Sequence, residues 1–239
     1  RWVVLGLLLG VAALIRVQDF AFGTLVIVEL AFAARDRRAL LRILVGGAIT
    51  LAVAVVVFTP QLLEWHFVFG KAFAVPQGPR YTRFGSPMIL ELLFSPRNGW
   101  LQTTPIAYAG LIGLACIPRQ HRIIGVGLAV VVLVQIYLNS TIEDWWAAAS
   151  YGQRRLCSVT LPLVVGNAAL LTRLARARLR WLQHAAVIVI FGGLVAVNLN
   201  RVWHLRAGRP APADLTPTCC AGMPSFVGGI YDRVGNPFE

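Results

Sequence analysis

The chain contains, from Leu51 to Phe58, the sequence Leu-Ala-Val-Ala-Val-Val-Val-Phe. A second run without polar side chains covers residues 130–134. A helix in a soluble bundle carries a polar residue at every third or fourth position, because one of its faces meets water. The two runs therefore predict helices that are surrounded by lipid rather than by water.

Apolar windows of similar composition recur along the whole chain. Of its 239 residues, 57% are hydrophobic and 13% are charged, and the mean hydropathy is +0.69. An ordinary soluble domain has about 25% charged residues. Several windows are shorter than the roughly 20 residues that a spanning helix needs, so flanking residues would have to extend them. The windows cover residues 2–15, 20–34, 43–58, 104–117, 123–138, 157–171 and 181–198.

The formal net charge of +12 comes largely from three short basic segments, at residues 35–42, 119–122 and 173–180. They follow the second, fourth and sixth apolar windows, so in a membrane protein all three would lie on one side. Short Arg-rich loops remain in the cytoplasm. Membrane topology thus explains the charge, and no nucleic-acid partner is predicted.

We therefore predict an all-α fold, a polytopic transmembrane helical bundle with roughly seven spans. The transmembrane domain covers residues 1–200, and an external tail covers residues 201–239. Residues 61–103 form a long external loop with short interfacial helices, one of them at residues 87–94. Gly6 and Gly10 give the first span a face for close helix packing. Glu29 lies inside the second span and must be protonated, paired or facing a polar cavity.

Three segments on the predicted external side carry charges and aromatic rings together. Guanidinium groups bind phosphate oxygens in pairs, and aromatic faces suit sugar rings or isoprenoid tails. Each segment alone is also explained by snorkelling arginines and an aromatic belt, but the three together predict a site for an amphipathic phosphate ester. Of the two adjacent arginines, we expect Arg154 to reach the ligand and its neighbour to anchor the interface. The candidate ligand-binding residues are Arg16, Gln18, Arg97, Asp144, Trp145, Tyr151, Arg154 and Arg155.

Other site signatures are absent from the sequence. It has no dinucleotide fingerprint, P-loop, HExxH or Gly-x-Ser-x-Gly motif. The four cysteines, Cys116, Cys157, Cys219 and Cys220, do not have the spacing of a metal site, and none is predicted. We interpret them as unpaired or structural, with a bridge from Cys157 to the tail left open.

The same polar segments resemble motifs of bacterial integral-membrane glycosyltransferases, the relatives of the dolichyl-phosphate-mannose protein mannosyltransferases and the lipid A aminoarabinose transferases. Residues 5–18, a Gly-rich span, are similar to one that ends in an Arg-Pro-Gln-type turn there, with Val17 in place of the proline. Residues 94–105 resemble the family's Phe-Ser…Gly-Leu…Thr-Pro segment. Residues 144–155 resemble its Trp-Trp…Ser-Phe-Gly-x-Arg loop, with Tyr151 in place of the phenylalanine.

The resemblance implies a multi-pass protein of the bacterial plasma membrane, with its catalytic face outside the cytoplasm. Such an enzyme transfers a sugar, with inversion, from a polyprenyl-phosphate-linked donor to a lipid, glycan or protein acceptor. Its expected partners are that donor and membrane lipids, and it works with or without a divalent metal. The family's catalytic Asp or Asp-Glu pair lies upstream of the matched region, and neither Asp19 nor Asp144 matches that position.

The chain is accordingly expected to be a fragment that keeps lipid-phosphate contacts and is inactive by itself. The alternative from another class is a non-catalytic membrane protein, such as a transporter or a scaffold subunit. Glu29 favours a transporter, whereas the scarcity of other charges inside the spans argues against one. An external Asp or Asp-Glu pair in upstream sequence would favour the transferase.

Overall fold

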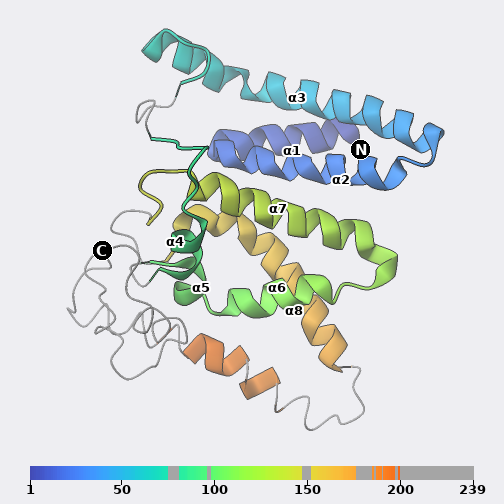
Figure 1. Cartoon of the computed structure of the whole chain (residues 1–239). Coiled ribbons are helices and arrows are strands. Elements are labelled where there is room, and N and C mark those ends of the chain that lie inside the picture. Colours follow the sequence, from blue (N-terminus) through green and yellow to red (C-terminus); the bar gives the residue numbers. More distant parts are fainter. Residues whose placement is uncertain are drawn as a thin grey trace.

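The computed structural model describes residues 1–74, 81–95, 98–146 and 152–175, and within 185–199 residues 185, 187–189, 191–196 and 199. These residues are helical throughout, apart from turns and one isolated β-bridge between Thr82 and Ile142. An all-helical fold was predicted and is confirmed. The elements, shown in Figure 1, are α1 (Trp2–Ile15), η1 (Val17–Gly23), α2 (Thr24–Ala33), α3 (Arg37–Phe69), α4 (Ile89–Phe94), α5 (Trp100–Thr103), α6 (Ile106–Ala115), η2 (Arg119–His121), α7 (Arg122–Ser140), η3 (Arg154–Val159) and α8 (Thr160–Ala175).

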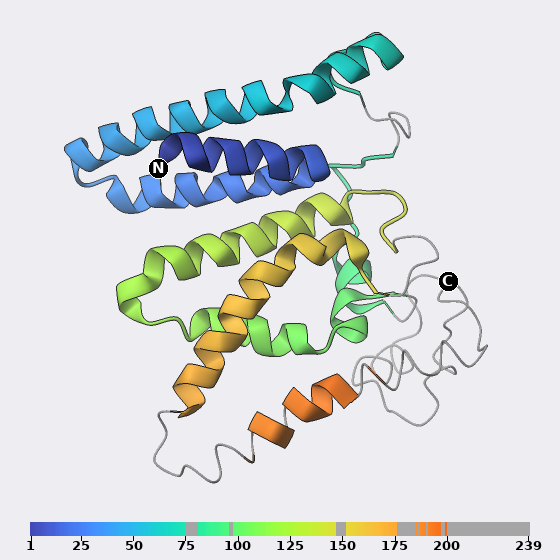
Figure 2. The same ribbon diagram turned by 180° about the vertical axis from the view of Figure 1, so that it is seen from behind.

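Two helix pairs are built on glycine contacts. Helix α1 packs along α3, where a Cβ added to Gly6 would lie 2.6 Å from the Thr50 carbonyl oxygen. A Cβ on Gly10 would lie equally close, 2.6 Å, to the Cβ of Val57. The predicted packing face of the first apolar window is thus confirmed. Helix α8 crosses α6 with glycine residues at the contact. Helix α2 contacts both α3 and α7 (Figures 1 and 2).

The buried core joins the short helices to the long ones. Trp100 from α5 and Leu92 from α4 pack in one cluster with Val132 from α7 and Val159 from η3. By contrast, large apolar side chains on the outer helices are exposed, such as Val56 of α3 at 70%. A water-soluble protein rarely leaves so many apolar side chains uncovered. This surface fits the lipid environment that the sequence predicts.

Three helical segments are long and apolar enough to cross a membrane: Arg37–Phe69, Arg119–Ser140 and Arg154–Ala175. The prediction of roughly seven spans is not supported beyond these three. Helices α2 and α6 have 10 residues each, and a helix of that length covers roughly 15 Å of a hydrocarbon core about 30 Å thick. The residues that were expected to extend the short windows form 3₁₀ turns instead, η1 beside α1 and α2 and η2 after α6.

Two predicted loops were placed wrongly. Residues 37–42 are the first turns of α3, because the Asp36 side chain caps the helix by accepting a hydrogen bond of 2.9 Å from the Arg38 amide. At the other end, α3 continues through Pro60 to Phe69 and stops at Gly70, whose φ is +67°. The predicted external loop therefore begins nine residues later than expected, after 69 rather than 60.

Packing explains why α3 is not ended by its proline. Phe58 and Trp65, on either side of Pro60, lie edge to face with ring centroids 5.9 Å apart. Phe20 from η1 packs edge to face on Phe58, and Ala13 of α1 completes the cluster. These contacts bury the side chains of Phe58 and Trp65 and offset the backbone hydrogen bond that Pro60 removes.

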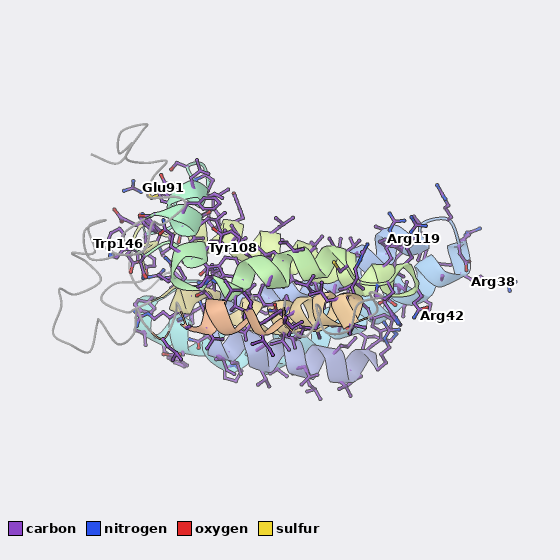
Figure 3. The ribbon with its side chains drawn as sticks, turned by 90° about the horizontal axis from the view of Figure 1, so that it is seen from below. Arg38, Arg42, Glu91, Tyr108, Arg119 and Trp146 are labelled. Atoms are coloured by element: carbon purple, nitrogen blue, oxygen red, sulfur yellow. The ribbon has the colours of Figure 1, made fainter. Side chains whose placement is uncertain are left out.

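Charged residues separate to the two ends of the bundle. Figure 3 shows Arg38, Arg42 and Arg119 at one end and Glu91 and Trp146 at the other. We call the first the basic end, formed by residues 34–42, 116–122 and 172–175. We call the second the loop end, formed by residues 16–23, 81–95, 98–103, 141–146 and 152–159. The predicted segregation of the basic segments is confirmed for these residues, while residues 176–180 and the tail 201–239 lie outside the described residues.

Glu29 in α2 is paired, one of the three states that the sequence allowed. Nη2 of Arg1 lies 2.7 Å and 2.8 Å from its two carboxylate oxygens. The pair neutralises the carboxylate on the apolar helix, as expected for a charge at that position.

Candidate functional site

Arg16 joins two of the three predicted segments. It follows α1 in extended conformation, and its Nη1 donates to the Arg154 carbonyl oxygen at 3.2 Å. The same nitrogen lies 2.9 Å from Sγ of Cys157. The guanidinium group of Arg16 therefore lies against η3, the segment that carries Arg154 and Arg155.

The two adjacent arginines have different surroundings, as the sequence predicted. Nη2 of Arg155 donates to Oδ2 of Asp144 at 2.5 Å and to the Tyr81 hydroxyl at 3.0 Å. The Arg155 side chain is 13% exposed and that of Asp144 is 30% exposed. Arg154 is exposed, and its side chain has no hydrogen-bond or ion-pair partner in the described part of the chain. Arg154 is thus the arginine of the pair whose exposed side chain can meet an anion.

Tyr81 is a site residue that the sequence did not reveal. It lies in the segment after α3, and its phenol ring stacks beneath the Arg155 guanidinium, 5.9 Å from ring centroid to Cζ. Burial raises the pKa of the Tyr81 hydroxyl above its ordinary value, and the Asp144 carboxylate raises it further, while Arg155 acts in the opposite direction. Tyr81 therefore stays neutral and adds no charge beside the ion pair.

A backbone clamp holds Tyr81 at this position. The Glu143 amide donates to the Tyr81 carbonyl at 2.9 Å, and the Arg83 amide donates to the Thr141 carbonyl at 2.6 Å. The side chains of Arg83 and Glu143 also form an exposed ion pair of 2.8 Å. The segment after α3 is thus attached to the turn that follows α7, a link that no sequence motif indicates.

Two amides in α7 form a hydrogen-bonded pair, and one of them, Gln135, binds the first segment. Nε2 of Gln135 donates to the Gln18 carbonyl and to Oδ1 of Asp19, both at 3.1 Å. Nδ2 of Asn139, one turn later, donates to Oε1 of Gln135 at 3.1 Å. Both amides are completely buried. Their spacing of four residues within an apolar helix is a signal that sequence reasoning could have used.

Asn98 connects the second segment to the third. Its Nδ2 donates to the carbonyls of Trp146 and Gly152 at 2.7 and 3.2 Å, and its Oδ1 accepts from the Gly152 amide at 3.0 Å. Nε2 of Gln153 donates to the Asn98 carbonyl at 2.7 Å. One buried asparagine thus binds both sides of residues 147–151. The three predicted segments therefore lie together at the loop end.

The other predicted ligand-binding residues differ in burial. Trp145 is 8% exposed and packs edge to face against Trp146, with centroids 5.9 Å apart. The Gln18 side chain is half-buried. Arg97 and Tyr151 lie outside the described residues.

Among the described residues, no group of three or more His, Cys, Asp and Glu side chains is arranged to hold a metal ion. Cys116 and Cys157 are free thiols, and Cys219 and Cys220 lie outside the described part. Comparisons of the chain with protein-family models, with curated proteins and with solved structures found no match.

Proposed function

We propose that the chain belongs to a membrane glycosyltransferase that moves a sugar from a polyprenyl-phosphate donor to an acceptor outside the cytoplasm. The observation that carries this proposal is the contact between Arg16 and the backbone of Arg154. It places two arginine residues from helices far apart in the sequence side by side at the loop end. Two guanidinium forks supply the donors and the positive charge that a phosphate diester needs near lipid.

The ion pair beside these arginines supports a role in holding the sugar. Oδ2 of Asp144 is bonded to Arg155, whereas Oδ1 is buried without a hydrogen-bond partner among the described residues. A buried acceptor of this kind gains stability when a hydroxyl donates to it. We assign Asp144 to binding a sugar hydroxyl, and Arg155 and Tyr81 to keeping its carboxylate in place.

The carboxylate that takes the proton in the transfer step is proposed to come from outside this set. Asp19 is 9% exposed and bonded to Gln135, and Asp144 is bonded to Arg155. In the reaction, the acceptor hydroxyl would lose its proton to a carboxylate and attack the anomeric carbon. The bond from that carbon to the phosphate oxygen would break, releasing polyprenyl phosphate. Arg16 and Arg154 would neutralise the charge on the leaving phosphate.

The proposed setting is the bacterial plasma membrane, with the basic end in the cytoplasm and the loop end outside. Beyond the three long segments, α1, α2, α6 and the apolar residues near 187–196 would complete about seven membrane segments. The transporter alternative has less support, because the Glu29 carboxylate that favoured it is neutralised by Arg1.

Binding of the donor's head group tests the proposal directly. The chain, purified in lipid nanodiscs, should bind polyprenyl phosphate more tightly than the polyprenol of the same length. A charge-assisted hydrogen bond contributes about 1.5–3 kcal/mol, so Arg16→Ala and Arg154→Ala should each weaken binding roughly 10- to 100-fold. Lysine keeps the charge but lacks the planar guanidinium group. The Lys variants should therefore bind more weakly than the unmodified chain and more tightly than the Ala variants. Arg38→Ala, at the basic end, is the matched control and should bind as the unmodified chain does.

Equal binding of the phosphate and the alcohol would contradict the proposal. So would unchanged binding in both alanine variants at normal protein levels, because the arginines would then serve only topology. Sugar transfer from a polyprenyl-phosphate donor should follow the same order of variants when measured in the enzyme that contains this chain.

A further inference from the structure

A second lipid contact is indicated at the opposite end of the bundle. A cavity of about 460 Å³ lies between α6 and α7 and is open along one side. Figure 1 shows these helices joined at the basic end by the η2 segment and running back side by side. The volume falls within the roughly 300–1,000 Å³ of small-molecule sites in proteins.

The lining of this groove is apolar over its whole length except at one end. Leu111 and Leu114 form one wall, Ala129 and Leu133 form the other, and Gly125 leaves room because it has no side chain. Arg122, the first residue of α7, is the one charged lining residue and lies at the basic end. An apolar channel with a cation at one mouth matches a chain molecule with an anionic head.

The Arg122 guanidinium lies at the mouth of the groove, and no described residue provides it with a hydrogen-bond acceptor. Its guanidinium lies over the Phe32 ring of α2, with Cζ 5.5 Å from the ring centroid. In the described part of the chain it has no hydrogen-bond or ion-pair partner, and residues 104–142 contain no Asp or Glu. Arg119 and His121 lie beside it, and the first turn of α7 has no side-chain cap. The helix dipole therefore adds to the positive charge at this point.

We propose that the groove between α6 and α7 binds one membrane phospholipid with an anionic head group, its acyl chain along α7 and its phosphate at Arg122. The inference does not depend on the proposed glycosyltransferase function, because the groove and its cation belong to the basic end. The other occupants to be distinguished are the donor's polyprenyl chain, a neutral lipid and a second copy of this chain.

Cys116, which directly follows the lining residue Ala115, provides a reporter position. A fluorophore would be attached there after Cys157, Cys219 and Cys220 are replaced by serine. The labelled chain would be placed in nanodiscs containing lipids with brominated acyl chains, which quench nearby fluorophores. Phosphatidylglycerol and phosphatidylcholine would be compared at equal mole fractions.

A preference of about fivefold for phosphatidylglycerol is expected at low salt, since one arginine near a membrane surface contributes about 1 kcal/mol towards an anionic lipid. Arg122→Gln should remove this preference, while Arg38→Gln at the same end should keep it. Ala129→Leu fills the groove and should reduce quenching by both lipids. Ile124→Leu is its matched control, because Ile124 lies on the same helix, is 54% exposed and does not line the groove.

Three results would overturn the proposal. Equal quenching by the two lipids would make the groove a neutral lipid contact. Polyprenyl phosphate would also be added at a concentration at which added phosphatidylglycerol has no effect. If it then relieved the quenching, the groove would be assigned to the polyprenyl chain of the donor. Weak quenching together with oxidative cross-linking between Cys116 residues of two molecules would make it a contact between copies.

Discussion

At the scale of single residues, the loop end depends on a few polar side chains that bind one another across long stretches of sequence. Arg155 is held by Asp144 and Tyr81, and Gln135 is bound to η1. Each interaction is largely shielded from water. Removing one partner therefore leaves the other as a buried polar group without its hydrogen bond or counter-ion.

We expect Asp144→Asn to destabilise the protein by about 1–3 kcal/mol, because the buried Arg155 guanidinium loses its counter-ion. Thermal unfolding in detergent, followed by tryptophan fluorescence, measures this change. The matched control is Glu143→Gln, which breaks the exposed ion pair to Arg83 and should cost about 0–1 kcal/mol. Equal losses in the two variants would show that the Asp144–Arg155 pair is no more important than a surface contact.

A second residue-scale prediction concerns Gln135. Replacing it by leucine keeps most of its volume but leaves the Asp19 carboxylate and the Gln18 carbonyl without their donor. The expected loss is about 1–3 kcal/mol. In a double-mutant cycle, Asp19→Ala should cost less in the Gln135→Leu background than alone, because the shared bond is already absent. Strictly additive losses would contradict this coupling.

At the scale of helices, α6 and α8 approach so closely that only glycine fits between them. A Cβ on Gly113 would overlap the carbonyl of Gly166, and a Cβ on Gly166 would overlap that of Gly110. The overlap is with backbone atoms, which cannot turn aside as a side chain can. Close approach of this type is the main source of helix association in lipid, where no hydrophobic force drives the helices together.

Gly113→Ala and Gly166→Ala should therefore each cost about 1–3 kcal/mol, the range for overpacking a close contact. Gly192→Ala is the control, since nothing lies within 4 Å of its added Cβ. That change should be neutral or stabilise by up to about 1 kcal/mol through better helix propensity. Unfolding in mixed detergent micelles at increasing denaturing-detergent content gives all three values. A Gly113→Ala variant as stable as Gly192→Ala would contradict the close packing.

The helix lengths also belong to this scale. The sequence predicted where apolar windows lie, because apolarity is a property of each residue. It did not predict that α3 continues past Pro60, since the stabilising contacts come from Phe20 and Ala13 in other elements. Nor did it show that α2 and α6 stop at 10 residues, because hydropathy alone does not mark the residue at which an α-helix gives way to a 3₁₀ turn.

At the scale of the whole molecule, the separation of charge between the two ends predicts the orientation of the protein in a membrane. In the described part, Arg38, Arg42 and Arg119 lie at one end, and the candidate site lies at the other (Figure 3). Positively charged segments are retained on the cytoplasmic side during insertion. The fold therefore predicts which end of the molecule faces the cytoplasm.

Cysteine labelling in intact cells tests this orientation. In a background without native cysteines, Arg83→Cys should react with an impermeant maleimide added from outside. Arg38→Cys should react only after the cells are permeabilised. The reverse pattern would show that the protein has the opposite orientation in the membrane, with the proposed site facing the cytoplasm.

The sequence by itself determined the helical class, the apolar surface, the separate basic segments and the three polar segments of the site. These follow from side-chain polarity and its order along the chain, which are local quantities. It also predicted that Arg154 and Arg155 would have different roles, because neighbouring residues on a helix point in different directions.

Only the tertiary structure decided which groups meet. Arg16 and Arg154 are 138 positions apart, and Gln135 and Asp19 are 116 apart. The pairing of Arg155 with Tyr81, the Asn98 connection and the groove beside Arg122 likewise depend on how the helices pack. Hydrogen bonds and close contacts act over a few ångströms, so their partners are determined by the folded arrangement and not by the order of residues.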